Sequence, residues 1–109
     1  MDNSRNYYRV EYPSGDRPSF ECAGRSYEVI DVSEMGLRLA VSADDPWVEN
    51  ETVVGTVTFR DNATCKVSGS VLRKTDDGIA IVLTEGVPLP RVLEEQRYLI
   101  KRYRRTVDP

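Results

Sequence analysis

Two arginines and a short polar motif are the residues of this sequence best suited to bind a ligand. Arg5 and Arg9 lie four residues apart, and Asp31, Ser33 and Gly36 form a second cluster. An arginine guanidinium is planar and permanently charged, so it suits phosphates and the edges of purines. Arginine also makes up 12 of the 15 basic residues. This bias favours recognition of a phosphate or a purine.

Residues for catalysis and metal binding are scarce. Histidine is absent, which excludes imidazole metal sites, Cys–His nucleophiles and Ser–His–Asp triads. Cys22 and Cys65 form no CxxC pair, and we expect both to be reduced and structural, with a redox role as the alternative. No clustered pair of carboxylates stands out. We therefore predict that the protein is not an enzyme and uses no metal and no cofactor.

Length and composition indicate one soluble domain spanning 1–109. The chain has 109 residues, of which 39% are hydrophobic and 30% are charged. No apolar run approaches the roughly 20 residues of a membrane helix, and the N-terminus has no apolar signal core. We therefore expect a cytoplasmic protein without membrane insertion. The net charge of −3 is divided unevenly, with −6 over residues 1–90 and +3 over 91–109.

The elements that must position these residues are short β-strands. Alternating apolar and β-branched stretches, separated by turn residues, predict strands over 20–22, 27–33, 37–41, 52–60, 65–73 and 78–84. Gly55 and Gly69 lie where strands could bend around a corner. Six strands at this spacing favour a small antiparallel β-barrel over residues 19–86.

The two ends of the chain differ from the barrel. Residues 1–18 are polar and rich in turn residues, which predicts an irregular, flexible segment. The C-terminal segment 87–105 changes to helical spacing and predicts an amphipathic helix over about 89–105. Three interpretations of this helix stand. Its apolar stripe packs on the barrel, the helix docks a partner or a second copy, or its basic end contacts nucleic acid.

Both polar motifs, in this order and on this strand pattern, resemble the PilZ domain, a bacterial receptor for cyclic di-GMP. That family carries RxxxR and, some twenty residues later, (D/N)xSxxG. Here Arg5-Asn6-Tyr7-Tyr8-Arg9 precedes Asp31-Val32-Ser33-Glu34-Met35-Gly36, and 21 residues separate Arg9 from Asp31. The resemblance covers nearly the whole chain and implies a six-stranded antiparallel barrel with a C-terminal helix.

The resemblance also implies a role for each motif residue. Arg5 and Arg9 would clamp the guanine bases and phosphates, because an arginine fork meets guanine O6 and N7 bidentately. Asp31 would accept from guanine N1–H and N2–H, and Ser33 would bond to the amine or to a phosphate. Gly36 would allow a tight turn and a close approach of the ligand. A downstream partner protein of unknown identity is expected.

Simpler interpretations of these residues remain open. Arg5 and Arg9 could be solvated surface charges, and Asp31 and Ser33 could only shape a turn. Arg38 either lines the site or is a plain exposed arginine. Trp47, Tyr7 and Tyr8 could stack on a base, although packing or exposure is the expected role.

Three other functions compete with a cyclic di-GMP receptor. The first is a PilZ-like adaptor that binds protein and no nucleotide, although such a chain would be expected to lack one of the two motifs. The second is a nucleic-acid-binding barrel, which would need a basic, aromatic sheet face. The net charge of −6 over 1–90 argues against it. The third is an enzyme, for which no catalytic constellation is found.

Overall fold

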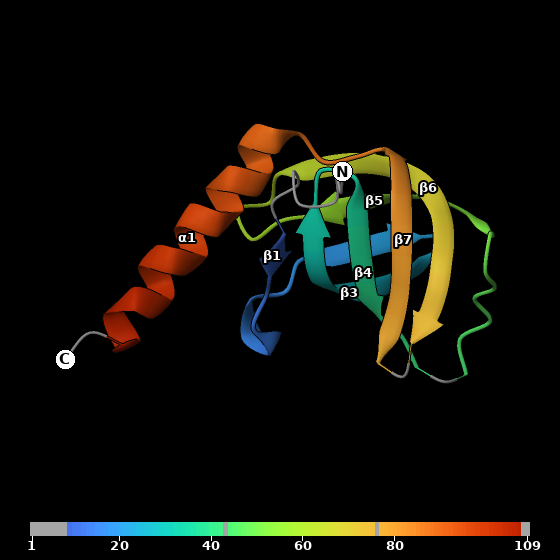
Figure 1. Ribbon diagram of the computed structural model, residues 1–109, viewed down its shortest axis with the longest axis horizontal. Coiled ribbons are helices and arrows are strands. Elements are labelled where there is room, and N and C mark those ends of the chain that lie inside the picture. The colour runs from blue at the N-terminus through green and yellow to red at the C-terminus, as the bar shows by residue number, and fades with distance from the viewer. Residues whose placement is uncertain (1–8, 43, 76, 108–109) are drawn as a thin grey trace, which may run out of the picture.

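The computed structural model describes residues 9–42, 44–75 and 77–107, with the side chains of the helix described through Tyr103. Its elements, in chain order, are β1 (Val10–Glu11), a 3-10 helix η2 (Ser14–Asp16), β2 (Ser19–Cys22), β3 (Arg25–Ser33), β4 (Gly36–Ala40), β5 (Thr52–Thr58), β6 (Thr64–Thr75), β7 (Gly78–Glu85) and α1 (Leu89–Val107). Figure 1 shows strongly curved strands wrapped into one barrel, with α1 projecting along one side.

Six of the strands close into an antiparallel barrel. The hydrogen-bonded order runs β3-β2-β5-β6-β7-β4, and β4 pairs with β3 again to complete the circle. This architecture confirms the predicted fold, and each predicted strand overlaps one of β2 to β7. The seventh strand, β1, lies outside the circle and pairs only with β3 among the described strands.

The core of the barrel is mainly aliphatic, and both Phe20 and Phe59 are buried in it. Phe20, Val29, Leu39 and Ile79 are completely buried, and β-branched residues from β5 and β6 fill the space between them. Alternation along each strand produces this core, since every second side chain of a half-buried strand points inward. At Gly69 the strands approach so closely that a Cβ would lie 2.0 Å from the Val82 carbonyl oxygen, at a register shift between β6 and β7.

The N-terminal segment is more ordered than its composition predicts. Residues 1–8, which include Arg5, Tyr7 and Tyr8, lie outside the described residues. Beyond them, Val10 and Tyr12 are both buried and belong to the hydrophobic core. The Tyr12 amide also donates to the Ile30 carbonyl at 2.9 Å. Where the sequence predicts an irregular segment, residues 10–11 and 14–16 therefore form short regular elements, because two apolar side chains at alternate positions are enough to pair a short strand with β3.

Helix α1 begins at the predicted residue and ends two residues later than predicted. It contacts β1 and β3, and β1 lies between the helix and the barrel (Figure 1). Val92 is buried and Leu99 packs against the core, so the first of the three interpretations holds for this face. Leu89 and Ile100, two further apolar residues of the same helix, are exposed instead. Within the described residues, no helix is long and apolar enough to cross a membrane.

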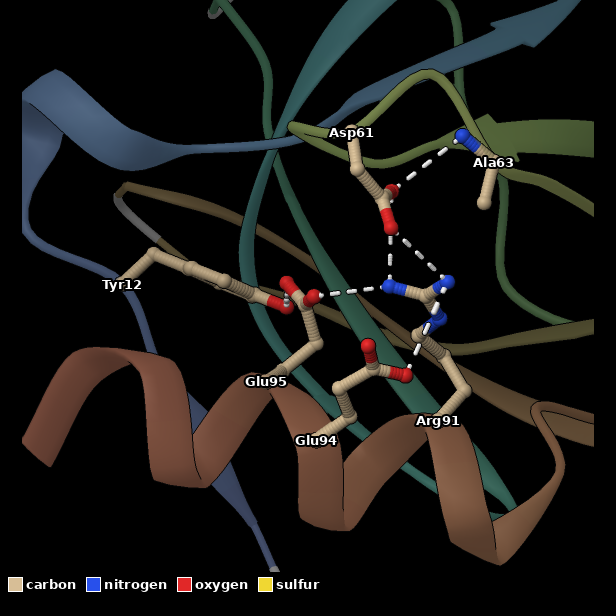
Figure 2. Close-up of polar contacts among 6 residues, drawn as sticks. All are labelled: Tyr12, Asp61, Ala63, Arg91, Glu94 and Glu95. Atoms are coloured by element: carbon tan, nitrogen blue, oxygen red, sulfur yellow. Dashed lines mark hydrogen bonds and ion pairs between the residues drawn. The ribbon is translucent and has the colours of Figure 1, made fainter.

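A buried polar network joins the helix to the N-terminal segment (Figure 2). The Tyr12 hydroxyl donates to Glu95 Oε1 at 2.8 Å, and Arg91 Nη1 donates to Glu95 Oε2 at 3.1 Å. Arg91 also pairs with Asp61, in the β5–β6 turn, at 3.2 Å. Glu95 is only 2% exposed, and a buried carboxylate is tolerated when both oxygens are bonded. Burial, and then the bond to Glu95, raise the pKa of Tyr12.

Removing the Tyr12 hydroxyl should destabilise the fold. In Tyr12→Phe, Glu95 Oε1 keeps its burial and loses its donor, so we expect the free energy of unfolding to fall by about 1–3 kcal/mol. Urea unfolding at neutral pH measures this change. Tyr98→Phe is the matched control, because the Tyr98 ring stacks under Arg60 and its hydroxyl has no hydrogen bond among the described residues. An equal loss in both variants would contradict the role of the network.

Candidate functional site

A β-bulge at Ile30 places the polar motif on the outer face of the barrel. Val29 pairs with Leu39 and Asp31 pairs with Arg38, so Ile30 is an extra residue with no partner in β4. Val29 and Val32 are both completely buried although they lie three residues apart, which strict alternation forbids. The bulge changes the phase of the alternation between them. As a result Asp31 and Ser33 face outward, beside Arg38 and Gly36 of β4.

The residue just before β1 adds an arginine to the other side of the motif. Its antiparallel register pairs Val10 with Val32 and Glu11 with Asp31. Arg9 precedes Val10 and therefore stands level with Ser33, and its side chain is exposed. Burial raises the pKa of the Asp31 carboxylate, and the nearby charge of Arg9 opposes that rise. The structure thus brings Arg9, Asp31, Ser33, Gly36 and Arg38 together, while Arg5 lies outside the described residues.

Asp31 is a buried carboxylate at the centre of this group. It is only 6% exposed, and Arg38 Nε lies 3.2 Å from Asp31 Oδ2. This contact is an ion pair rather than a well-formed hydrogen bond, and neither atom has a hydrogen-bond partner within the described part of the chain. Burial raises the pKa of Asp31, and the charges of Arg38 and Arg9 oppose that rise. The motif aspartate is therefore a buried, ion-paired carboxylate whose Oδ2 can still accept a hydrogen bond.

Arg38 is half-buried and lies between two carboxylates. Besides the pair with Asp31, its Nη2 lies 3.9 Å from Asp77 Oδ2 in the β6–β7 turn. Of the two interpretations of Arg38, the one that places it in the site agrees with this position. Asp77 is a neighbour that sequence reasoning missed, since the pair Asp77-Gly78 signalled only a hairpin. The Thr75 hydroxyl and then Arg38 lower the pKa of Asp77.

Gly36 is required for space rather than for an unusual backbone angle. It pairs with Ser33 across the turn, and a Cβ at Gly36 would lie 3.1 Å from Ser33 Oγ. Gly24 is the glycine with a positive φ among the described residues, so Gly36 is not in the left-handed region. The absent side chain leaves the Ser33 hydroxyl uncovered. A ligand can therefore approach it closely.

The turn between Ser33 and Gly36 contacts the segment that leads into α1. The Leu83 amide donates to the Met35 carbonyl at 2.9 Å, and the Val87 amide donates to the Glu34 carbonyl at 3.0 Å. At Gly86 a Cβ would lie 1.8 Å from the same Glu34 oxygen, so only glycine fits there. The motif turn is therefore joined to the base of the helix, a contact between distant residues that no local pattern reveals.

Trp47 does not take part in this site. It is buried in the hydrophobic core and lies edge-on to Tyr27, with ring centroids 5.6 Å apart. This position agrees with core packing, the expected role, rather than with stacking on a base. Among the residues that the structure describes, no group of three or more Cys, Asp or Glu side chains is arranged to hold a metal ion.

Comparisons with known proteins agree with the fold and the motif. A family model described as the PilZ domain matches residues 3–104. No curated protein matches the sequence. Among solved structures, the crystal structure of an uncharacterized Legionella protein aligns with a TM-score of 0.53 and 15% identity. That alignment covers 91% of this chain and 96% of the other, and at this identity it shows a shared fold.

Burial of Asp31 should cost stability at neutral pH. Because its pKa is raised, the folded protein holds this proton more tightly than the unfolded chain does. The stability that the group contributes is complete below about pH 4, the unfolded pKa, and is lost as the pH rises through the raised folded pKa. We therefore expect Asp31→Asn to resist urea better than the wild type at neutral pH, with a difference that shrinks in acid.

Asp77→Asn is the matched control for this prediction. Asp77 is exposed and its pKa is lowered, so the charged form stabilises the fold. The control variant should lose stability at neutral pH, and its loss should shrink as the pH falls through the lowered pKa. The same sign of change in both variants would show that burial of Asp31 is not the cause.

Proposed function

Because this chain belongs to the PilZ domain family, we propose that it is a receptor for cyclic di-GMP that changes conformation on binding and signals to a partner protein. The family consists of receptor and adaptor domains rather than enzymes. The observation that supports nucleotide binding most directly is the convergence of Arg9, Asp31, Ser33 and Arg38 on one outer face.

The chemistry of these residues matches the two halves of the nucleotide. The exposed Arg9 and the half-buried Arg38 supply forks for phosphate oxygens or for guanine O6 and N7. Asp31 supplies an acceptor for guanine N1–H and N2–H, and the uncovered Ser33 hydroxyl can bond to the amine or to a phosphate. Arg5, four residues before Arg9, would complete the clamp.

The burial of Asp31 implies that binding rearranges the site. A carboxylate that is 6% exposed and paired with Arg38 presents little surface to a guanine edge. To reach it, a ligand must displace Arg38, which has Asp77 as a second partner at 3.9 Å, or shift β1, which pairs with β3 at Asp31. Arg38 would then be free to contact a phosphate. This exchange of partners is the proposed conformational step.

Two contacts could carry the change to α1. Tyr12 follows Arg9 by three residues and bonds to Glu95 of the helix at 2.8 Å. On the other side, the turn after Ser33 bonds to Val87, two residues before the helix begins. A ligand that moves Arg9 or Ser33 therefore acts on the helix from both sides. This arrangement supports α1 as the element that a partner protein reads.

Arg9→Ala should weaken cyclic di-GMP binding strongly. A charge-assisted hydrogen bond contributes about 1.5–3 kcal/mol, so we expect a loss of about ten- to a hundredfold in affinity by calorimetric titration. Arg25→Ala is the matched control, because Arg25 is exposed at the opposite end of β3 and pairs with Asp45 at 3.4 Å.

Titration of the wild type with other nucleotides tests specificity in the same experiment. Cyclic di-AMP lacks the N1–H and N2–H donor pair, and GTP lacks the second base, so both should bind poorly. Unchanged affinity in Arg9→Ala would reject the clamp. No binding of cyclic di-GMP to the wild type would leave the protein-interaction adaptor that binds no nucleotide.

If the bond from Tyr12 to Glu95 carries the change to α1, a variant without this bond should bind the nucleotide without the response of the helix. Saturating cyclic di-GMP should slow amide hydrogen exchange in the first turns of α1, because the ligand fixes the segment on which the helix rests. Tyr12→Phe should keep its nucleotide affinity and lose most of this protection, whereas Tyr98→Phe should keep both. Full protection of α1 in Tyr12→Phe would show that the signal does not pass through this bond.

A further inference from the structure

A groove lies along the outer face of α1, where the helix passes the β5–β6 turn. It encloses about 400 Å³. We call it the Tyr98 groove, and its lining residues are Arg60, Glu94, Arg97, Tyr98, Ile100 and Lys101. Arg60 lies in the β5–β6 turn, and the other five residues belong to the helix. Neither the core nor the nucleotide site uses these residues.

The Tyr98 groove is basic although the whole chain is acidic. Arg60, Arg97 and Lys101 face one carboxylate, Glu94, which lies 3.9 Å from Arg91. Within the described residues, the three cations have no ion pair of their own. The chain carries a net charge of −3. A cluster of cations with no ion pair among the described residues concentrates the attraction of such a protein for an anionic partner at one place.

The groove also has an apolar element. Ile100 is 52% exposed, an unusual position for a residue that continues the apolar stripe of the helix. Beside it, the Arg60 guanidinium covers the Tyr98 ring at 3.7 Å from the ring centroid, which holds both side chains in place. An aliphatic side chain of a partner could pack on Ile100 while its neighbouring carboxylates meet the cations.

We propose that the Tyr98 groove is a docking site for an acidic protein segment that carries an aliphatic anchor. A nucleic acid fits the groove less well, since Glu94 lies within it, the Tyr98 face is already covered by Arg60, and the remaining chain repels a polyanion. The proposal names the chemistry of the partner and does not depend on whether the protein binds a nucleotide.

A labelled, glutamate-rich peptide with two leucines is the probe, and fluorescence anisotropy at low ionic strength, without nucleotide, is the measurement. We expect the double variant Arg97→Glu/Lys101→Glu to weaken binding about tenfold, because each substitution replaces attraction with repulsion. The control Lys66→Glu/Lys74→Glu makes the same change of charge at exposed positions on β6 and should change the affinity less than about twofold.

The apolar anchor has its own test. Ile100→Ser should weaken peptide binding, whereas Leu72→Ser, at an exposed leucine on β6, should not. Unfolding by urea checks that every variant folds, and neither Ile100 nor Leu72 belongs to the core, so this second pair stays informative if the charge reversals unfold the helix.

Five results would overturn the proposal. Four come from binding measurements: no binding of the peptide by the wild type, equal weakening by the two charge variants, undiminished binding of a peptide with serine in place of leucine, and stronger binding of a single-stranded DNA oligonucleotide than of the peptide. Self-association of the wild type that Arg97→Glu/Lys101→Glu abolishes would assign the groove to a second copy and also overturn it. Because these measurements contain no cyclic di-GMP, each of these results leaves the outcome of the cyclic di-GMP titration open.

Discussion

One extra residue in β3 determines which side chains reach the candidate site. Without the bulge at Ile30, alternation from the buried Val29 would turn Asp31 into the barrel and Val32 out of it. A carboxylate in an aliphatic core would be prohibitively costly, so pairing with β4 and the burial of Val32 both stabilise the bulged arrangement. The same shift brings Asp31 opposite Arg38. The fold and the polar motif therefore depend on a single irregularity, and neither can change without the other.

The N-terminal segment is the second feature on which function depends, because it lies between the barrel and α1. Val10 and Tyr12 attach it to the core, while the exposed Arg9 precedes it. The helix in turn rests on this segment through Glu95. At the other end of the segment, Asp16 bonds to Arg102 and Tyr103. The orientation of α1 is thus tied to the segment that follows Arg9, rather than to the barrel alone.

Sequence reasoning predicted the barrel, the helix and the motif because each is encoded locally, in alternation, helical spacing and the order of polar residues. It could not predict the bulge, which exists only because β3 meets β4 in a particular register. Nor could it predict that the motif turn touches Val87, a contact between distant residues. Glu95 did leave a signal: it occupies a position between Val92 and Leu99 that an apolar stripe would fill, which indicates a buried charge with a partner.

The energetics of Asp31 connect stability with the proposed function. A carboxylate held out of water, and paired with Arg38 by an ion pair that is not a well-formed hydrogen bond, makes the protein less stable at neutral pH than it could be. Structural ion pairs are normally satisfied by further bonds, as Glu95 is by Tyr12 and Arg91. The two buried carboxylates among the described residues therefore differ in kind. Glu95 is satisfied and fixes a helix, whereas Asp31 retains acceptor capacity, so that under the proposed function a guanine edge would relieve a cost that the folded protein already carries.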